Sequence, residues 1–274
     1  GRLLANHCDG WHSFEPVNGG PWMTDEGGLA AIEDPHTCAE GLLMDETGSH
    51  VYRVGGVRLE TFAVEPEGGL RLVEEHSLRG GIPSFAMSND GRHVYVATGP
   101  ALWVFDRDQQ TGMLSRNGFV HEVGTWYSDR PNPLAVSDDD AYLFLFRGGS
   151  NRAHVFSLEN PSSPEHRAEL SEFWDAEWGW ERCGFADVRG DSATLDVLCS
   201  GLAITARWNP ESGDLVGTDF VTPRTADRFN GAPMPEFDEL RGVVATADDA
   251  NLYVSTPAHG ILVFSRVGGI DETD

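Results

Sequence analysis

The stretch SNDGRHVYVATGPALWVFDRDQQTGML, residues 88–114, decides the fold. It passes from a polar turn into a strand rich in Val and Tyr, then through a short loop into a second apolar strand and a second turn that contains Gly112. Polar, glycine-bearing turns between short runs of β-branched and aromatic residues are typical of antiparallel hairpins. Because no segment of the chain keeps the 3.6-residue period of a helix, we expect an all-β protein.

The same order of turns and strands recurs along the chain. Its anchor positions are Tyr52, Tyr95, Phe144, Asp196 and Tyr253, which lie 43, 49, 52 and 57 residues apart. Repeats of this length with four strand signals each are typical of β-propeller blades. We therefore predict a propeller of four-stranded antiparallel blades, at approximately 39–81, 82–121, 122–172, 173–222 and 223–274.

Only five blades can be counted, which raises the question of how the ring closes. The last repeat ends soon after its third strand, so the N-terminal segment, residues 1–38, is expected to contribute the ring-closing strand. Alternatively, that segment holds part of a sixth blade, another chain completes the ring, or the chain is a fragment of a longer protein.

The repeat can be written Ser-x-Asp-Gly-x-x-Val-Tyr-Val, then a strand of the form aliphatic-x-Val-Phe, then Asp-x-x-Thr-Gly-x-Leu. This pattern resembles the repeat of the lactonase-type β-propellers, whose founding activity is 6-phosphogluconolactonase. The resemblance is closest at 82–121, good at 39–81 and 128–160, and weak at 183–222. It implies a propeller, usually of seven blades, and it specifies the blade better than the chemistry.

The chain is strongly acidic. Its 44 acidic residues face 19 basic ones, all of them arginine, and the formal net charge is −25. Such a charge excludes sequence-independent binding to nucleic acid and disfavours an anionic membrane surface, and no apolar run approaches the roughly 20 residues of a spanning helix. The acidity and the absence of lysine indicate a salt-adapted (halophilic), high-GC source; selection against reactive amines is the alternative.

The cysteines suggest an oxidising compartment. Cys8, Cys38, Cys183 and Cys199 form no CxxC pair, and an even number without metal or redox spacing suits two disulfides. Cys183 and Cys199 flank a turn sequence at 189–192 and could face each other across a hairpin; buried free thiols are the alternative. With a start at Gly1 that reads as a processed or engineered terminus, this predicts an extracellular or periplasmic protein.

Functional residues of a propeller are expected in the loops just before the first strand of each repeat. Three such loops, within 121–131, 173–182 and 227–241, combine aromatic rings with carboxylates and arginines, as a site for a small polar ligand requires. The candidate ligand-binding residues are Trp126, Tyr127, Trp174, Trp178, Trp180, Arg228 and Asn230. In the competing interpretation, the tryptophans wedge between blades and the acids are solvated surface.

No catalytic motif is present, and the sequence alone does not decide whether the protein is an enzyme. A Gly-x-Ser-x-Gly elbow, a P-loop, a dinucleotide fingerprint and HExxH are all missing. Lactone hydrolysis could use a positioned water with one base and one arginine, for which Asp129 or Glu181 and Arg130 or Arg182 are candidates. We expect no cofactor, although Glu177, Glu181, Asp238 and Glu239 could hold Ca²⁺ through carboxylate oxygens.

The sequence is compatible with three functions. The leading expectation is an exported, non-catalytic propeller that binds a small polar ligand or a protein partner, alone or as a subunit of a larger extracellular assembly. The alternative is a lactonase or sugar-acid hydrolase of the 6-phosphogluconolactonase-like type. The third is a structural or adhesive repeat protein that stacks with or is completed by other chains.

Overall fold

A computed structural model gives the fold as a series of short strands. Every regular element that it describes is a strand, and no helix in this part of the chain is long and apolar enough to cross a membrane. The described residues are 3–7, 10–15, 23–24, 41–66, 69–78, 84–98, 101–122, 134–137, 139–147, 152–171, 183–189, 194–199, 202–209, 211–212, 214–221, 242–245, 251–256 and 260–265.

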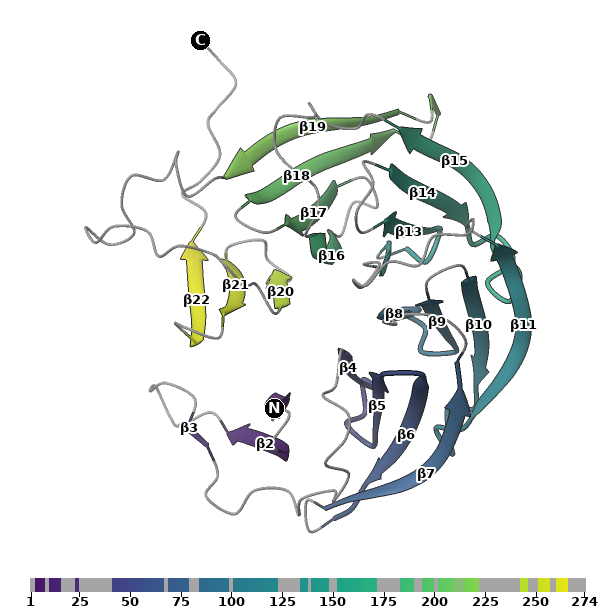
Figure 1. Ribbon diagram of the computed structural model, residues 1–274, viewed down its shortest axis with the longest axis vertical. Helices are drawn as coiled ribbons and strands as arrows, with labels where there is room; N and C mark the ends of the chain where they lie inside the picture. Colours follow the sequence, from purple (N-terminus) through teal and green to yellow (C-terminus); the bar gives the residue numbers. More distant parts are fainter. Residues whose placement is uncertain are drawn as a thin grey trace. The chain divides into compact units, whose positions relative to one another are not determined.

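The chain divides into two compact units, of which the first is Gly1–Asp129. It contains three antiparallel sheets whose strands follow one another in chain order (Figure 1). The first sheet holds β1 (Leu3–His7), β2 (Gly10–Glu15) and β3 (Met23–Thr24); the second holds β4 (Gly41–Met44), β5 (His50–Gly55), β6 (Arg58–Val64) and β7 (Leu70–Ser77); the third holds β8 (Ser84–Met87), β9 (His93–Thr98), β10 (Ala101–Arg107) and β11 (Leu114–Glu122).

The second unit, Arg130–Asp274, is built in the same way. Its sheets are also antiparallel and ordered along the chain. One sheet holds β12 (Leu134–Val136), β13 (Tyr142–Arg147), β14 (Arg152–Ser157) and β15 (Glu165–Ser171); the next holds β16 (Cys183–Arg189), β17 (Thr194–Cys199), β18 (Leu202–Asn209) and β19 (Asp214–Val221); the last holds β20 (Gly242–Ala245), β21 (Asn251–Thr256) and β22 (Gly260–Ser265).

These sheets confirm the predicted all-β class and the four-stranded antiparallel blade. Four of the five predicted repeats form complete four-stranded sheets, and the described part of the fifth forms three strands, β20–β22. The N-terminal segment, from which we expected a single closing strand, carries the three-stranded β1–β3 sheet. Whether one of its strands closes a ring stays a prediction.

The turn at residues 88–93 is held by hydrogen bonds among its own backbone and side-chain atoms. The Ser88 amide donates to the His93 carbonyl oxygen (3.0 Å), the Ser88 hydroxyl donates to Asp90 Oδ1 (2.7 Å), and the His93 amide donates back to Ser88 Oγ (2.9 Å). The turn at residues 137–142 makes the same three bonds. These turn residues therefore fix where the second strand of each sheet begins.

One position of this turn needs a left-handed backbone. Gly48, Gly91 and Asp140 occupy it in three successive repeats, with φ of 69°, 67° and 55°. Glycine adopts this conformation without a steric penalty, and aspartate is among the few other residues that tolerate it. The repeat thus has a glycine here for a backbone reason, and Asp140 is a tolerated exception.

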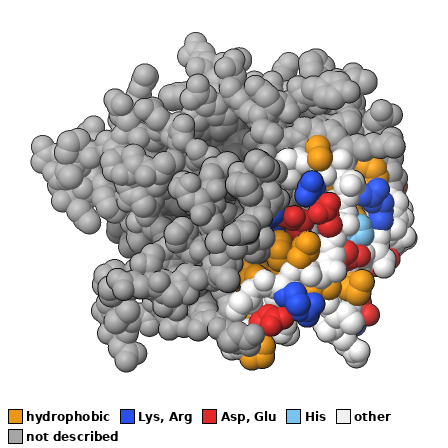
Figure 2. All heavy atoms as spheres, turned by 60° about the horizontal axis from the view of Figure 1, so that its bottom comes forward, with side chains coloured by type: hydrophobic (Ala, Val, Ile, Leu, Met, Phe, Trp, Pro, Cys, Tyr) orange, Lys and Arg blue, Asp and Glu red, His pale blue; other side chains and the backbone are white. Residues whose placement is uncertain are grey.

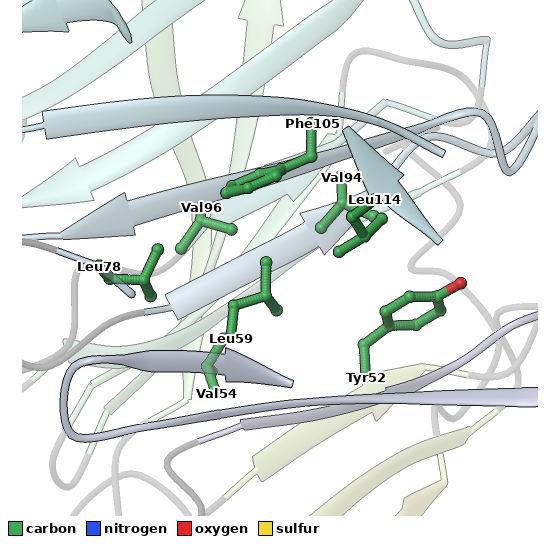
Figure 3. Close-up of a cluster of buried hydrophobic side chains, with 8 residues drawn as sticks. All are labelled: Tyr52, Val54, Leu59, Leu78, Val94, Val96, Phe105 and Leu114. Atoms are coloured by element: carbon green, nitrogen blue, oxygen red, sulfur yellow. The ribbon is translucent and has the colours of Figure 1, made fainter. Parts of the chain in front are cut away.

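Side chains on the second strand of a sheet point alternately to its two faces, and those on one face form part of the core between two sheets of the first unit. Tyr52 and Val54 on β5 point toward the β8–β11 sheet, whereas Val51 lies on the opposite face and packs with Phe62. The resulting cluster consists of Tyr52, Val54, Leu59, Leu78, Val94, Val96, Phe105 and Leu114 (Figure 3). Burial of a side chain of this size contributes about 1.5–3 kcal/mol, so this cluster is a main source of the attachment of the two sheets.

Candidate functional site

The three predicted site loops each lead from the last strand of one sheet to the first strand of the next. Residues 123–133 link β11 to β12, residues 172–182 link β15 to β16, and residues 222–241 link β19 to β20. In the second unit, β16 contacts both β12 and β20. The three loops therefore enter first strands that are consecutive neighbours in one unit, as a shared site requires.

The side chains of these loops lie outside the described residues, so their roles stay predictions. This holds for all the proposed ligand-binding, catalytic and calcium-binding residues: Trp126, Tyr127, Asp129, Arg130, Trp174, Glu177, Trp178, Trp180, Glu181, Arg182, Arg228, Asn230, Asp238 and Glu239. Within the described ranges, no group of three or more His, Cys, Asp or Glu side chains could hold a metal ion.

Cys183 and Cys199 stand at the entry to one of these first strands. They are partners in the antiparallel register of β16 and β17, next to a register shift between Cys183 and Phe185. Directly opposed positions on antiparallel strands bring Cβ atoms within the range from which a disulfide can form. The backbone thus has the hairpin geometry that the sequence predicted, while the disulfide itself and the Cys8–Cys38 pair, which lies outside the described residues, stay predictions.

A buried polar cluster in the first unit is the best-defined group of ionisable side chains. Arg107, at the end of β10, donates through Nη2 to Asp45 Oδ2 (2.5 Å), through Nη1 to the Gly91 carbonyl oxygen (2.9 Å) and through Nε to the Tyr52 hydroxyl. The Tyr52 hydroxyl donates to the Gly112 carbonyl oxygen (2.9 Å). The cluster therefore joins the turn before β5 to the β8–β9 turn, through Gly91, and to the β10–β11 turn, through Gly112.

The carboxylate of Asp45 is the centre of this cluster. Its Oδ1 accepts the amides of Ser49 (2.8 Å) and His50 (3.3 Å), and its Oδ2 lies 3.0 Å from His50 Nδ1. Burial raises the pKa of Asp45, but the hydrogen bonds from His50 and Ser49 together outweigh burial and hold this pKa below its ordinary value. Asp45 is therefore the charged partner of Arg107 at neutral pH.

Tyr52 stays a neutral phenol in the same surroundings. Burial is the largest influence and raises its pKa, although the adjacent Arg107 guanidinium acts in the opposite direction. A neutral hydroxyl can accept from Arg107 and donate to the Gly112 carbonyl at once.

Carboxylate, imidazole, phenol and guanidinium are groups that could perform acid–base chemistry, but this cluster is closed to substrate. The side chains of Asp45 and Arg107 are each 4% exposed, and all three nitrogens of the Arg107 guanidinium already have acceptors. We conclude that the cluster holds sheets together.

Sequence reasoning missed this cluster, although a signal for it was present. In the sequence, His50 and His93 occupy equivalent repeat positions, each directly before a Val-Tyr pair. The structure gives both a carboxylate neighbour, but a different one: Asp45 of its own turn for His50, and Asp106 (Nε2 to Oδ1, 3.5 Å) for His93. Asp45 stands where the other two described turns have serine. This difference from the repeat was a better signal for the cluster than the two histidines.

A second buried ion pair lies on the opposite face of β5. Arg53 and Glu60 are cross-strand partners on β5 and β6. Arg53 Nη2 lies 2.5 Å from Glu60 Oε2, and the two side chains are 5% and 6% exposed. The Arg53 guanidinium also lies over the Phe62 ring, 5.6 Å from its centroid. This pair, too, is buried in the sheet packing and is not placed to meet a ligand.

Most of the other described arginines are also paired with carboxylates. Arg58 meets Glu75 at 3.4 Å and Arg71 meets Glu65 at 2.7 Å. Figure 2 shows acidic and basic side chains next to one another on the described part of one face. Exposed pairs of this kind contribute about 0–1 kcal/mol each, so their main effect is to neutralise the few cations that the chain has.

Comparison with known proteins establishes the fold. No family model matches the sequence, and no curated protein matches it. Two solved structures described as "putative 6-phosphogluconolactonase" are similar: that from Bacteroides fragilis (17% identity, 99% of this chain and 78% of that one, TM-score 0.68) and that from Bacteroides uniformis (18%, 97% and 78%, 0.67). A third is the periplasmic gluconolactonase PpgL of Pseudomonas aeruginosa (17%, 94% and 73%, 0.66).

These similarities correct the leading expectation for the function. We had ranked a non-catalytic, exported binding or scaffold module above a lactonase, because no catalytic motif was found. That ranking was wrong: these three similar structures are named as lactonases, and they favour the alternative. A propeller site assembled from loops leaves no motif in the sequence, so the missing motif was weak evidence. At this level of identity the similarity shows the fold, and the chain is therefore a β-propeller with the fold of these three structures.

Proposed function

We propose that the protein is a lactone hydrolase that opens the ring of a sugar lactone or a related small polar lactone. The observation that carries the proposal is the match of nearly the whole chain to three lactonase-named propellers. The composition of the loops before β12, β16 and β20 supports it, because aromatic faces beside carboxylates and arginines suit a hydroxylated ring.

The chemistry requires only a water, a base and a cation. In this scheme Asp129 or Glu181 takes a proton from the water as its oxygen attacks the lactone carbonyl carbon, and Arg130 or Arg182 stabilises the oxyanion that forms. The carbonyl re-forms as the ring carbon–oxygen bond breaks, and the leaving alkoxide receives a proton. The product is the hydroxy acid, which releases one proton at neutral pH.

A panel of lactones, with acid release followed in a pH-stat, tests the proposal. We expect turnover above the spontaneous rate, and a loss of about 10²-fold or more in kcat for whichever of Glu181→Gln, Asp129→Asn, Arg182→Ala and Arg130→Ala removes the base or the cation. Arg71→Ala, on the exposed face of β7, is the matched control. A panel without any turnover above the spontaneous rate contradicts the proposal.

Charge favours an uncharged lactone over a phosphorylated one. The net charge is −25, and six of the seven arginines whose side chains the structure describes are paired with carboxylates. A field of this sign slows the approach of a dianion. We expect kcat/KM for glucono-1,5-lactone to be independent of salt and that for its 6-phosphate to be lower and to rise with salt. The opposite salt dependence for the phosphate would point to a cationic pocket in the loops.

Neither a resident cofactor nor a second chain is needed in this scheme. If Glu177, Glu181, Asp238 and Glu239 do hold Ca²⁺, treatment with EDTA lowers activity and added Ca²⁺ restores it.

We also propose an exported, periplasmic or extracellular enzyme. The support is the periplasmic gluconolactonase among the similar structures and the opposed Cys183 and Cys199, which could form a disulfide in an oxidising compartment.

A further inference from the structure

The Asp45–Arg107 ion pair is built from two departures from the repeat. The first is in the turn between the first and second strands. The amides of Asp45, Ser88 and Ser137 donate to the carbonyl oxygens five residues further on, at 3.1, 3.0 and 2.9 Å, which makes these three positions equivalent. Two of them have serine, and among these three described turns only that of the β4–β7 sheet has aspartate.

The second departure is at the end of the third strand. The amides of Val64, Arg107 and Leu158 donate to the carbonyl oxygens of Ser49, Arg92 and Ala141, at 2.8, 2.7 and 2.8 Å, so these positions are equivalent as well. Two of them are aliphatic, and the β8–β11 sheet has arginine. The two departures are complementary in charge, and they occur on sheets that pack against each other in one unit.

The aspartate keeps the function of the serine and adds a new one. Ser88 Oγ accepts the His93 amide, and Asp45 Oδ1 accepts the equivalent His50 amide. The second carboxylate oxygen, which serine lacks, is the atom that binds Arg107. The turn geometry therefore did not require aspartate in place of serine. The partners that the structure gives Asp45 Oδ2 are the His50 ring, which belongs to the same turn, and Arg107, which belongs to another sheet.

Stability alone does not explain a buried pair of this kind. The desolvation of two charges offsets most of their attraction, and replacement of such a pair by apolar residues is often neutral or stabilising. The β12–β15 sheet has Leu158, 3% exposed, at the position of Arg107. An aliphatic contact was therefore available within the same repeat.

We propose that the Asp45–Arg107 pair fixes the β8–β11 sheet as the neighbour of the β4–β7 sheet, so that the blades assemble in the right order. The sheets share their turn geometry, and an apolar core discriminates poorly between similar faces, so misassembly is a known failure of repeat proteins. Packed against the β12–β15 sheet, which has Leu158 at this position, or against the β4–β7 sheet of a second molecule, which has Val64, Asp45 would be buried without its cation. The wrong order is thereby penalised.

Variants that restore the repeat-typical residues test this role. We compare Asp45→Ser, Arg107→Leu and the double variant with the wild type, and use Glu65→Gln/Arg71→Leu, which removes an exposed pair, as the control. Urea unfolding gives stability. Refolding from urea at increasing protein concentration, followed by size-exclusion chromatography with mass measurement and near-UV circular dichroism, gives the fidelity of assembly.

We expect each single variant to lower the folded-to-unfolded ratio by about 100-fold or more, and the double variant by less than about 10-fold. The double variant should nevertheless refold into a mixture, with dimers and non-native near-UV spectra that increase with concentration, while the wild type and the control refold to one monomeric species.

Two results would overturn the proposal. A double variant that refolds with wild-type yield and spectrum at every concentration would show that the pair does not guide assembly. A double variant that fails to fold would show that the pair is needed for stability itself. Single variants that fail to fold beside a soluble double variant support the proposal, because the loss then comes from the unpaired charge.

Discussion

At the scale of single residues, Asp45 makes the stability of the first unit depend on pH in the acidic range. Its pKa is held below the ordinary value in the folded state, which means that the unfolded chain binds a proton more readily than the folded protein. The stability that Asp45 provides is therefore fully present above the unfolded pKa of about 3.9 and is lost as the pH falls through the folded pKa.

This sign leads to a prediction for Asp45→Asn. The difference in unfolding free energy between wild type and variant should shrink below about pH 4, as Asp45 itself becomes protonated. Urea unfolding at a series of pH values measures it, and the other carboxylates cancel in the difference. A difference that stays constant down to pH 3 contradicts the prediction.

A second residue-scale prediction concerns the close approach of Gly112 to His50. A Cβ atom at Gly112 would lie 2.3 Å from His50 Cδ2, and φ is +70°. Gly112→Ala should therefore cost about 2–3 kcal/mol through overpacking and backbone strain.

Gly48→Ala is the control for Gly112→Ala. At Gly48 the φ is +69°, but the nearest atom to an added Cβ is Met44 Sδ at 3.7 Å. This variant pays the backbone cost alone, about 1–2 kcal/mol. Equal losses of unfolding free energy in the two variants would show that the contact with His50 relaxes without cost.

At the scale of elements, the repeat pattern predicted strands and turns well because both depend on neighbouring residues. Tyr52 and Tyr95 fall on second strands and are fully buried, and Ser88 and Asp90 close the turn that their sequence indicated. The pairing of Asp45 with Arg107 could not be predicted in this way, because it joins residues 62 positions apart and depends on how two sheets pack.

The candidate site was harder to predict for a related reason. The loops at 123–133, 172–182 and 222–241 do not follow the repeat, so one loop gives no information about the next. The strands that follow these loops, β12, β16 and β20, are the first strands of their sheets. The contacts of Trp178 or Arg182 depend on loop conformations that no periodicity constrains.

The β16–β17 hairpin carries an element-scale prediction. Because Cys183 and Cys199 are register partners, non-reducing peptide mapping should recover the two strands as one disulfide-linked species. The Cys183→Ser/Cys199→Ser variant should lose about 3 kcal/mol of unfolding free energy, as expected for a loop of this size. Complete alkylation of both thiols in unreduced, denatured protein would rule the bond out.

At the scale of the whole molecule, charge repulsion opposes folding. A net charge of −25 confined to a folded protein repels itself, and exposed pairs such as Arg58–Glu75 offset little of this. The melting temperature should therefore rise by several degrees between about 10 mM and 150 mM NaCl, where the Debye length falls to about 8 Å. A rise that begins only at molar salt would show that screening is not the cause.

The ion pair that spans two sheets also affects how such a gene can change. A crossover between the codons of Asp45 and Arg107 would deliver one partner without the other and leave a charge buried. The repeats that form the β4–β7 and β8–β11 sheets are therefore expected to be duplicated or lost together, as one unit.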